Sequence, residues 1–103
     1  MTDRELLELA AKTAGIHGCW VADGINTGSN PSPVIWNPLD DDGDALRLAV
    51  KLEINPKWLE GKALAWAVGK SAICRAEALG KDPYAATRRA IVRAAAEIGR
   101  QMP

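Results

Sequence analysis

The residues with the clearest chemical potential in this chain are four aspartates in the stretch WNPLDDDGDALRLAVKLEI, residues 36–54. An EF-hand calcium loop needs oxygen ligands at positions 1, 3, 5 and 12 and a glycine at position 6. If Gly43 takes position 6, position 1 is Pro38 and position 12 is Ala49. Both anchoring ligands are then missing, so we expect no metal site here. The aspartates instead indicate a helix start, because acidic side chains interact favourably with the unpaired amides of a helix N-terminus.

A second group of residues could bind a ligand. Four arginines share the segment DPYAATRRAIVRAAAEIGRQMP, and a lysine precedes a tryptophan in NPKWLEGK. Guanidinium and ammonium groups contact phosphates, and an exposed tryptophan between cations is a protein-binding hot spot or a stacking platform for a base. The candidate binding residues are therefore Arg88, Arg89, Arg93, Trp58 and Lys57. The structural alternatives are a solvated arginine face, partly neutralised by the acidic half of the chain, and a Trp58 that covers the core.

The sequence has no arrangement typical of catalysis. A nucleophile needs an adjacent base, and His17 is the sole histidine, in no signature with Ser71 or Cys74. The glycine-containing stretch GINTGSNP lacks both the lysine of a phosphate-binding loop and the third glycine of a dinucleotide-binding loop. We therefore expect a protein that is not an enzyme and that binds no cofactor and no metal.

Composition indicates a single domain over residues 1–103, with 48% hydrophobic and 25% charged residues. No stretch approaches the roughly 20 apolar residues of a membrane span, and MTDRELLELAAK lacks the basic start of a secretory signal. We expect a cytoplasmic protein with no membrane partner. Cys19 and Cys74 are far apart in sequence, which predicts two reduced, half-buried thiols.

The two halves of the chain differ in charge although the formal net charge is 0. Residues 1–55 contain nine acids and four bases, and residues 56–103 contain four acids and nine bases. Opposite charges of this kind attract each other within one fold or between subunits. A homo-oligomer whose acidic and basic poles meet is therefore one possibility. A clear basic excess, which is usual for a nucleic-acid-binding domain, is absent.

Three helices are expected from capping and periodicity. Thr2 and Glu5 fit a capping box for the first helix, which ends at Gly15. The second helix starts at one of the aspartates 40–42 and ends near Leu52. Its apolar residues predict burial around most of its circumference: Ala45, Leu46, Leu48, Ala49, Val50 and Leu52.

The third helix has the clearest start signal, with Asp82 as N-cap and Pro83 in the first position, and Gly99 and Pro103 are expected to bound its end. Its spacing predicts a core-facing side made of Tyr84, Thr87, Ile91, Ala94, Ala95 and Ile98.

Strands are expected at 19–21 and 34–36, with a loop over 22–33 between them. A second hairpin is expected from ALAWAV (63–68) and AICRAEAL (72–79), joined by a turn at 69–71. One long helix over 62–79 is the alternative, because alanine favours helix. Trp20, Trp36 and Trp66 suit strand positions in the core. The predicted order is α-β-β-α-β-β-α, an α+β fold with one four-stranded, mainly antiparallel sheet.

Three blocks of the sequence resemble a known family: MTDRELLELAAKTAGI, WNPLDDDGDALRLAVKL and DPYAATRRAIVRAAAEIG. They are similar, in this order, to the small phage and prophage proteins grouped as the phage ABA sandwich domain. The resemblance implies a three-layer α-β-α sandwich and no catalytic residues. It departs in segments 22–33 and 55–80, which would set the choice of partner.

The expected function is that of a small non-enzymatic phage or prophage accessory protein that acts by binding. Its partner would be a host protein or a small nucleotide ligand, as in an inhibitor of a host defence. The alternative is a nucleic-acid-binding accessory factor of phage replication or transcription. Such a factor would bind with an affinity that falls steeply with salt.

Overall fold

The computed structural model describes residues 1–28, 32–67 and 73–102. Its elements are α1 (Asp3–Ala14), β1 (Cys19–Val21), β2 (Gly24–Asn26), β3 (Ile35–Trp36), α2 (Asp42–Leu52), β4 (Ile54–Leu59), β5 (Lys62–Ala67), β6 (Ile73–Ala78) and α3 (Pro83–Gln101). The described strands form two three-stranded antiparallel sheets, ordered β1-β2-β3 and β4-β5-β6. The expected α+β class is confirmed, whereas the expected single four-stranded sheet is wrong.

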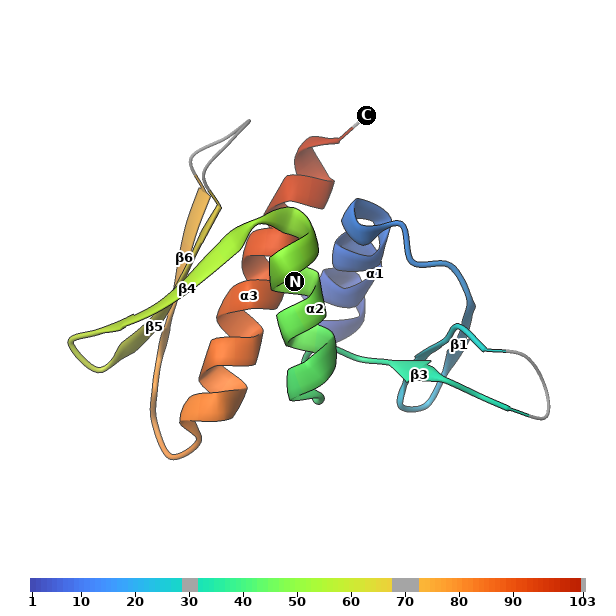
Figure 1. Ribbon diagram of the computed structural model, residues 1–103, viewed down its shortest axis with the longest axis horizontal. Helices are drawn as coiled ribbons and strands as arrows, with labels where there is room; N and C mark the ends of the chain where they lie inside the picture. Colours follow the sequence, from blue (N-terminus) through green and yellow to red (C-terminus); the bar gives the residue numbers. More distant parts are fainter. Residues whose placement is uncertain (29–31, 68–72, 103) are drawn as a thin grey trace.

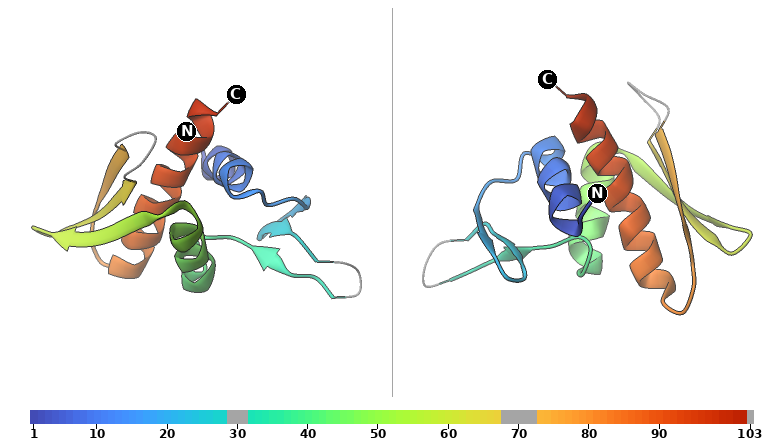
Figure 2. Two further views of the ribbon diagram at one scale, coloured as in Figure 1. Left: turned by 45° about the horizontal axis from the view of Figure 1, so that its top comes forward. Right: turned by 180° about the vertical axis from the view of Figure 1, so that it is seen from behind.

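Helix α3 is the centre of the fold (Figure 1). The sheet β4-β5-β6 packs on one side of α3, and α1 and α2 pack on its other side. The small sheet β1-β2-β3 lies beyond α1 and α2, at the opposite end of the molecule (Figure 2). The helices therefore lie between the two sheets, and the expected order of layers, with a sheet between helices, is wrong.

The caps that were expected from the sequence are present. The Thr2 hydroxyl accepts a bond of 3.2 Å from the Glu5 amide, and the Glu5 carboxylate accepts one of 3.2 Å from the Thr2 amide. Gly15 ends α1 in the left-handed conformation, with φ of 70°. At the start of α3, the Asp82 carboxylate accepts bonds from two amides. Helix α3 ends at Gln101, between Gly99 and Pro103, as expected.

Helix α1 packs closely on α3 at Gly99, which lies in the last turns of α3. A Cβ atom on Gly99 would lie 2.3 Å from the Leu9 carbonyl oxygen and 2.5 Å from the Thr13 hydroxyl. The Thr13 hydroxyl also lies within hydrogen-bonding distance of the Ala95 carbonyl, at 3.1 Å. Gly99 is therefore the contact point of two helices rather than a helix end.

Strand β2 lies inside the segment 22–33 that was expected to be a loop. It pairs with β1 through a two-residue turn, because Val21 is opposite Gly24. The two turn residues are Ala22 and Asp23, and Gly24 begins β2 with a φ of 142°. Ala-Asp is not one of the Asn-Gly or Asp-Gly pairs that signal a two-residue hairpin turn, so this turn was missed. Because β2 also pairs with β3, it separates the two strands that were expected to be neighbours. Residues 29–31 of the expected loop lie outside the described residues.

The second sheet confirms one expectation and corrects two. Strands β5 and β6 pair antiparallel, with Trp66 opposite Cys74, so the hairpin is confirmed and the alternative helix over 62–79 is wrong. The expected turn at 69–71 lies outside the described residues. Strand β4 was missed because Pro56 interrupts its pattern. A proline is compatible with an edge strand, and β4 is at the edge of this sheet.

Three large side chains that were expected in the core are exposed. In α2, Ala45, Leu48 and Ala49 are buried, but Leu46 and Val50 are 61% and 71% exposed, so the expected burial around most of the helix is wrong. In α3 the expected core face is confirmed at Ile91, Ala94 and Ala95, but Tyr84 is 69% exposed. A helix has one face toward its neighbours, and apolar residues around the rest of its circumference remain in water.

Candidate functional site

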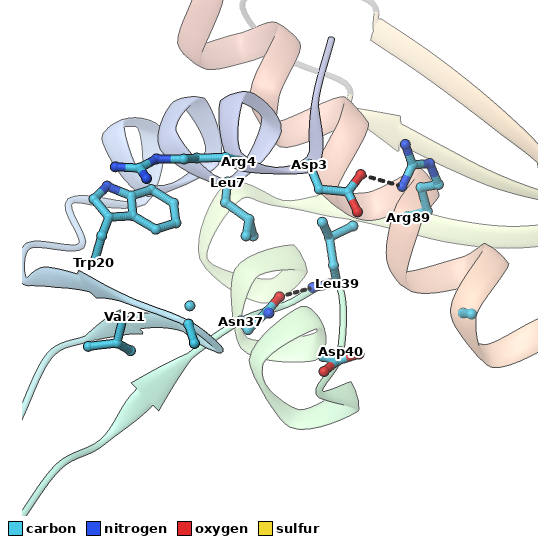
Figure 3. A pocket seen from close by; sticks show the side chains of 12 residues that line it. Asp3, Arg4, Leu7, Trp20, Val21, Asn37, Leu39, Asp40 and Arg89 are labelled. Atoms are coloured by element: carbon cyan, nitrogen blue, oxygen red, sulfur yellow. Dashed lines mark hydrogen bonds and ion pairs between the residues drawn. The ribbon is translucent and has the colours of Figure 1, made fainter.

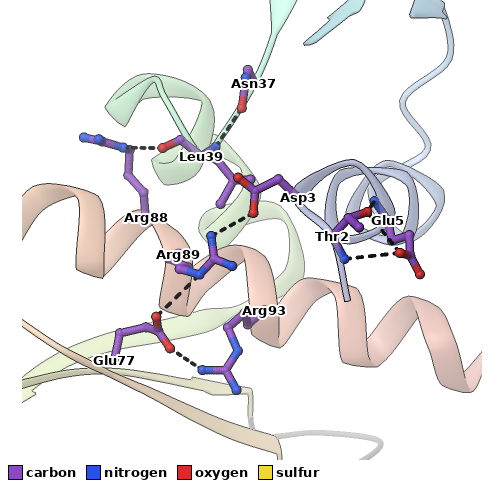
Figure 4. Close-up of polar contacts among 9 residues, drawn as sticks. All are labelled: Thr2, Asp3, Glu5, Asn37, Leu39, Glu77, Arg88, Arg89 and Arg93. Carbon is purple, nitrogen blue, oxygen red and sulfur yellow. Dashed lines mark hydrogen bonds and ion pairs between the residues drawn. The ribbon is translucent and has the colours of Figure 1, made fainter. Parts of the chain in front are cut away.

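Arg88 is the most enclosed of the three candidate arginines (Figure 4), with a side chain that is 15% exposed. Its Nε donates to the Leu39 carbonyl oxygen at 2.8 Å, and its guanidinium lies 2.7 Å from the Asp42 carboxylate. These contacts join α3 to the start of α2. The Leu39 carbonyl and the Asp42 carboxylate therefore occupy part of the guanidinium, and Asp42 offsets its positive charge.

Arg89 and Arg93 are held in the same way. Arg89 contacts the Asp3 carboxylate of α1 at 2.9 Å and the Glu77 carboxylate of β6 at 3.5 Å. Arg93 forms an ion pair with Glu77 and donates to the Ala76 carbonyl oxygen at 3.2 Å. The acidic first half and the basic second half therefore attract each other within the fold. These pairs offset the positive charge on which a phosphate site would depend.

The candidate residues of β4 lie on opposite sides of the sheet, because successive strand residues alternate in direction. The Lys57 ammonium is 5.5 Å from the centre of the Trp66 ring, on the face that points away from α3. Trp58 points toward α3, where its indole N–H donates to the Thr87 hydroxyl at 2.9 Å. The five candidate binding residues therefore do not form one site.

Trp58 borders a groove between α2, β4 and α3, which we call the Trp58 groove. It has a volume of about 410 Å³, and its walls include Leu46, Pro56, Trp58, Tyr84, Arg88 and Ile91. Most of the exposed lining is apolar. The charged groups are Asp42 and Arg88, which pair with each other.

Three large apolar side chains that line the Trp58 groove are exposed to solvent. Leu46 of α2, Trp58 of β4 and Tyr84 of α3 are 61%, 59% and 69% exposed. The hydrogen bond to Thr87 fixes the tryptophan ring and leaves its apolar surface available. Trp58 was a candidate from sequence, whereas Leu46 and Tyr84 were missed because helical spacing placed them in the core.

A second pocket, of about 590 Å³, lies between the start of α1, the small sheet and the segment before α2 (Figure 3). Here the Arg4 guanidinium stacks on Trp20, 4.6 Å from the ring centre, and Asp3 pairs with Arg89. Three of the four charged side chains that line this pocket, those of Asp3, Arg4 and Arg89, therefore already interact with protein groups. We regard the Trp58 groove as the better binding site, although it is smaller.

The aspartates of the opening stretch have structural roles. Asp41 caps α2 by accepting from the Asp44 amide at 2.8 Å. The Asp44 side chain is buried. Its carboxylate accepts from the backbone N–H of Asn37 at 3.0 Å and from the Arg47 guanidinium at 2.7 Å. Within residues 1–28, 32–67 and 73–102, no group of three or more His, Cys, Asp or Glu side chains could hold a metal ion.

The two cysteines differ from the expectation in their burial. Cys19 and Cys74 are free thiols, and both are exposed rather than half-buried. Trp36 is buried and Trp20 packs against the core, as expected, but Trp66 is 42% exposed. Cys74 and Trp66 are opposite each other on the same sheet face.

Comparisons of the chain with protein-family models, with curated proteins and with solved structures gave no match. The resemblance to the phage ABA sandwich domain therefore stays a prediction. Among the described residues, none of the helices is both long and apolar enough to span a membrane.

One electrostatic contact predicts a pH effect. Two hydrogen bonds from Arg100, at 2.9 and 3.1 Å, are the main cause that lowers the pKa of Glu97 from 4.5 to about 2. Burial opposes this shift, and the hydrogen bond from Gln101 and the charges of Arg100 and Arg75 add to it. The folded pKa lies below the unfolded one, so this stabilisation is present above pH 4.5 and is lost as the pH falls toward 2. The free energy of unfolding, measured by urea titration, should therefore fall over this range. In Glu97→Gln the free energy of unfolding should fall less steeply with pH over this range. A pH dependence as steep as that of the wild type would show that the Glu97–Arg100 contact does not cause the fall.

Proposed function

We propose that this protein acts by binding a protein partner, an apolar segment of which enters the Trp58 groove. The observation that carries the proposal is the exposure of Leu46, Trp58 and Tyr84 around one largely apolar groove. Exposed apolar surface of this kind, with a polar rim, is typical of interaction sites. Tryptophan and tyrosine are also the residues most enriched among binding hot spots.

The chemistry of the groove favours a protein over a nucleotide or a nucleic acid. A nucleotide needs free cationic donors for its phosphates beside an aromatic ring for its base. Arg88, the guanidinium of this groove, already donates to Leu39 and pairs with Asp42. An apolar side chain requires no such donors and would bury the exposed ring surface of Trp58.

The biological setting is part of the proposal and rests on the sequence resemblance. A phage or prophage accessory protein that inhibits a host defence would work in the host cytoplasm by occupying a surface of a host protein. Such a role needs no catalytic group, cofactor or metal. A compact domain with one exposed aromatic groove is compatible with it.

Substitution of Trp58 tests the proposal. Peptides of random sequence are displayed and selected on the wild-type protein, and the affinity of each selected peptide is measured for wild type, Trp58→Ala and Trp66→Ala. We expect enrichment of peptides with aromatic or aliphatic anchors, and a loss of affinity of at least about tenfold in Trp58→Ala. Trp66→Ala is the matched control, because Trp66 lies on the opposite sheet face.

The salt dependence separates the proposed function from its alternatives. Binding in the Trp58 groove should change little with ionic strength, whereas binding to a phosphate chain weakens steeply as salt rises. Selected peptides that bind Trp58→Ala as tightly as wild type would overturn the role of the groove. Salt-sensitive binding of duplex DNA that survives Trp58→Ala would favour the nucleic-acid alternative.

A further inference from the structure

The sheet β4-β5-β6 has one face covered by α3 and one face that is open. Strand alternation turns Ala63, Ala65 and Ala67 of β5 toward α3, where they are buried. Leu64 and Trp66 point the other way, and Trp66 is 42% exposed. Among the described residues, no helix or strand lies over this second side (Figure 1). We call the side chains of β4, β5 and β6 that point away from α3 the open face.

The open face has the shape of a wedge. Along β4 it presents long side chains, including Lys57 and Leu59. Along β6 it presents short ones, Cys74, Ala76 and Ala78, all of them exposed. We call the β4 side, with its long side chains, the thick side of the open face and the β6 side the thin side. Strand β5 runs between them, so one row of side chains separates the two sides. A two-fold axis parallel to the strands would place the thick side of one copy over the thin side of another.

The edges of this sheet are blocked against the addition of another strand. Pro56 on the β4 edge has no N–H to donate. On β6, the Cys74 and Ala76 carbonyl oxygens accept from Arg75 and Arg93 at 3.0 and 3.2 Å. The pairing pattern of the ladder turns these two carbonyls away from β5. Association through this sheet is therefore favoured face to face rather than edge to edge.

The accessible surface is large for the mass of the chain. It amounts to 6399 Å², whereas the scaling for folded monomers gives about 5,600 Å² for a protein of 11.0 kDa. This excess of roughly 800 Å² belongs to the chain as a whole, and exposed side chains of the open face, such as Leu59 at 62% and Trp66 at 42%, contribute to it. One partner in an interface of standard size buries about 800 Å².

The charges permit two copies to approach. The formal net charge is 0, so there is no long-range repulsion between copies. The charged side chains of the open face are Lys57 and Lys62. In the structure the Lys57 ammonium lies 5.5 Å from the centre of the Trp66 ring. In the two-fold arrangement the Lys57 stem would lie over the short Ala76 side chain of the other copy, and the ammonium would turn outward to the solvent-exposed rim.

We propose that a second copy of this chain covers the open face, and that the protein is a two-fold symmetric dimer with β4 of each copy over β6 of the other. The acidic and basic poles play no part in this interface, because Asp42 and Asp3 are paired within the chain. The Trp58 groove lies on the other side of the sheet. A dimer would therefore present two grooves, independent of its own interface.

The test combines the mass in solution with thiol protection. Sedimentation equilibrium should give twice the chain mass for wild type and for the control Ala22→Arg, at an exposed residue outside the open face. Ala76→Arg, which fills the thin side and brings a cation against Lys57 of the other copy, should give the mass of one chain. Circular dichroism of both variants verifies that they are folded.

Alkylation of the wild type with N-ethylmaleimide tests the same interface without any substitution. Cys74 should react several-fold more slowly as the protein concentration is raised through the dimerisation range. Cys19, exposed on β1, is the internal control and should not change. A wild-type monomer at high concentration, or a dimer in which Cys74 reacts as freely as in dilute solution, would overturn the proposal. Neither result bears on the Trp58 groove, because Trp58→Ala should remain dimeric.

Discussion

Replacement of Gly99 by alanine is expected to lower the free energy of unfolding by about 2–3 kcal/mol. In an isolated helix the same change would stabilise by roughly 1 kcal/mol, because alanine is the better helix former. Here the new methyl group would meet the Leu9 carbonyl oxygen at 2.3 Å. That oxygen belongs to the backbone of α1 and cannot rotate away, so the two helices must separate.

Urea unfolding measures this effect, and the melting temperature should fall by roughly 10 °C. Gly43→Ala in α2 is the matched control. A Cβ there would lie 3.2 Å from the end of the Arg47 side chain, which can move, and 3.1 Å from the Asp41 cap oxygen, which needs to shift by only a few tenths of an ångström. We expect Gly43→Ala to change stability by less than about 0.5 kcal/mol. A stabilised Gly99→Ala variant would show that α1 and α3 do not pack as closely as described.

Removal of the Asp44 carboxylate is expected to have the second large effect, a loss of about 2–3 kcal/mol for Asp44→Ala. Asp44 is 7% exposed and accepts from the Asn37 amide at 3.0 Å. It also accepts from Arg47 at 2.7 Å. Without the carboxylate, the Asn37 amide loses its acceptor, and the segment that leads from β3 into α2 is no longer tied to the helix.

Thermal and urea unfolding of two further variants separate the contributions. Asp44→Asn keeps an oxygen for the Asn37 amide but loses the ion pair, so we expect about half of the effect of Asp44→Ala. Asp40→Ala, at an exposed aspartate of the same cluster, should fall within about 0.5 kcal/mol of wild type. Equal losses in Asp40→Ala and Asp44→Ala would mean that general acidity near the helix start matters rather than the buried contact.

The candidate site could be predicted from the sequence in part. Trp58, between two lysines in a polar context, gave a usable signal for an exposed aromatic residue. Leu46 and Tyr84 gave the opposite signal, because their helical spacing is that of core residues. Their exposure follows from the direction in which α2 and α3 contact each other, which periodicity within one helix does not contain. The arginines looked like a free basic face because their partners are distant in sequence, such as Asp3 for Arg89.

The sequence by itself determined the local structure of this protein. The Thr2 and Asp82 caps, the left-handed Gly15 and the β5-β6 hairpin depend on hydrogen bonds and turns between residues close in the chain, so their signals are local. Only the tertiary structure decided the order of the layers, the helical faces that stay in water and the acids that hold the arginines. These features depend on contacts between segments far apart in the chain, for which a single sequence carries no direct signal.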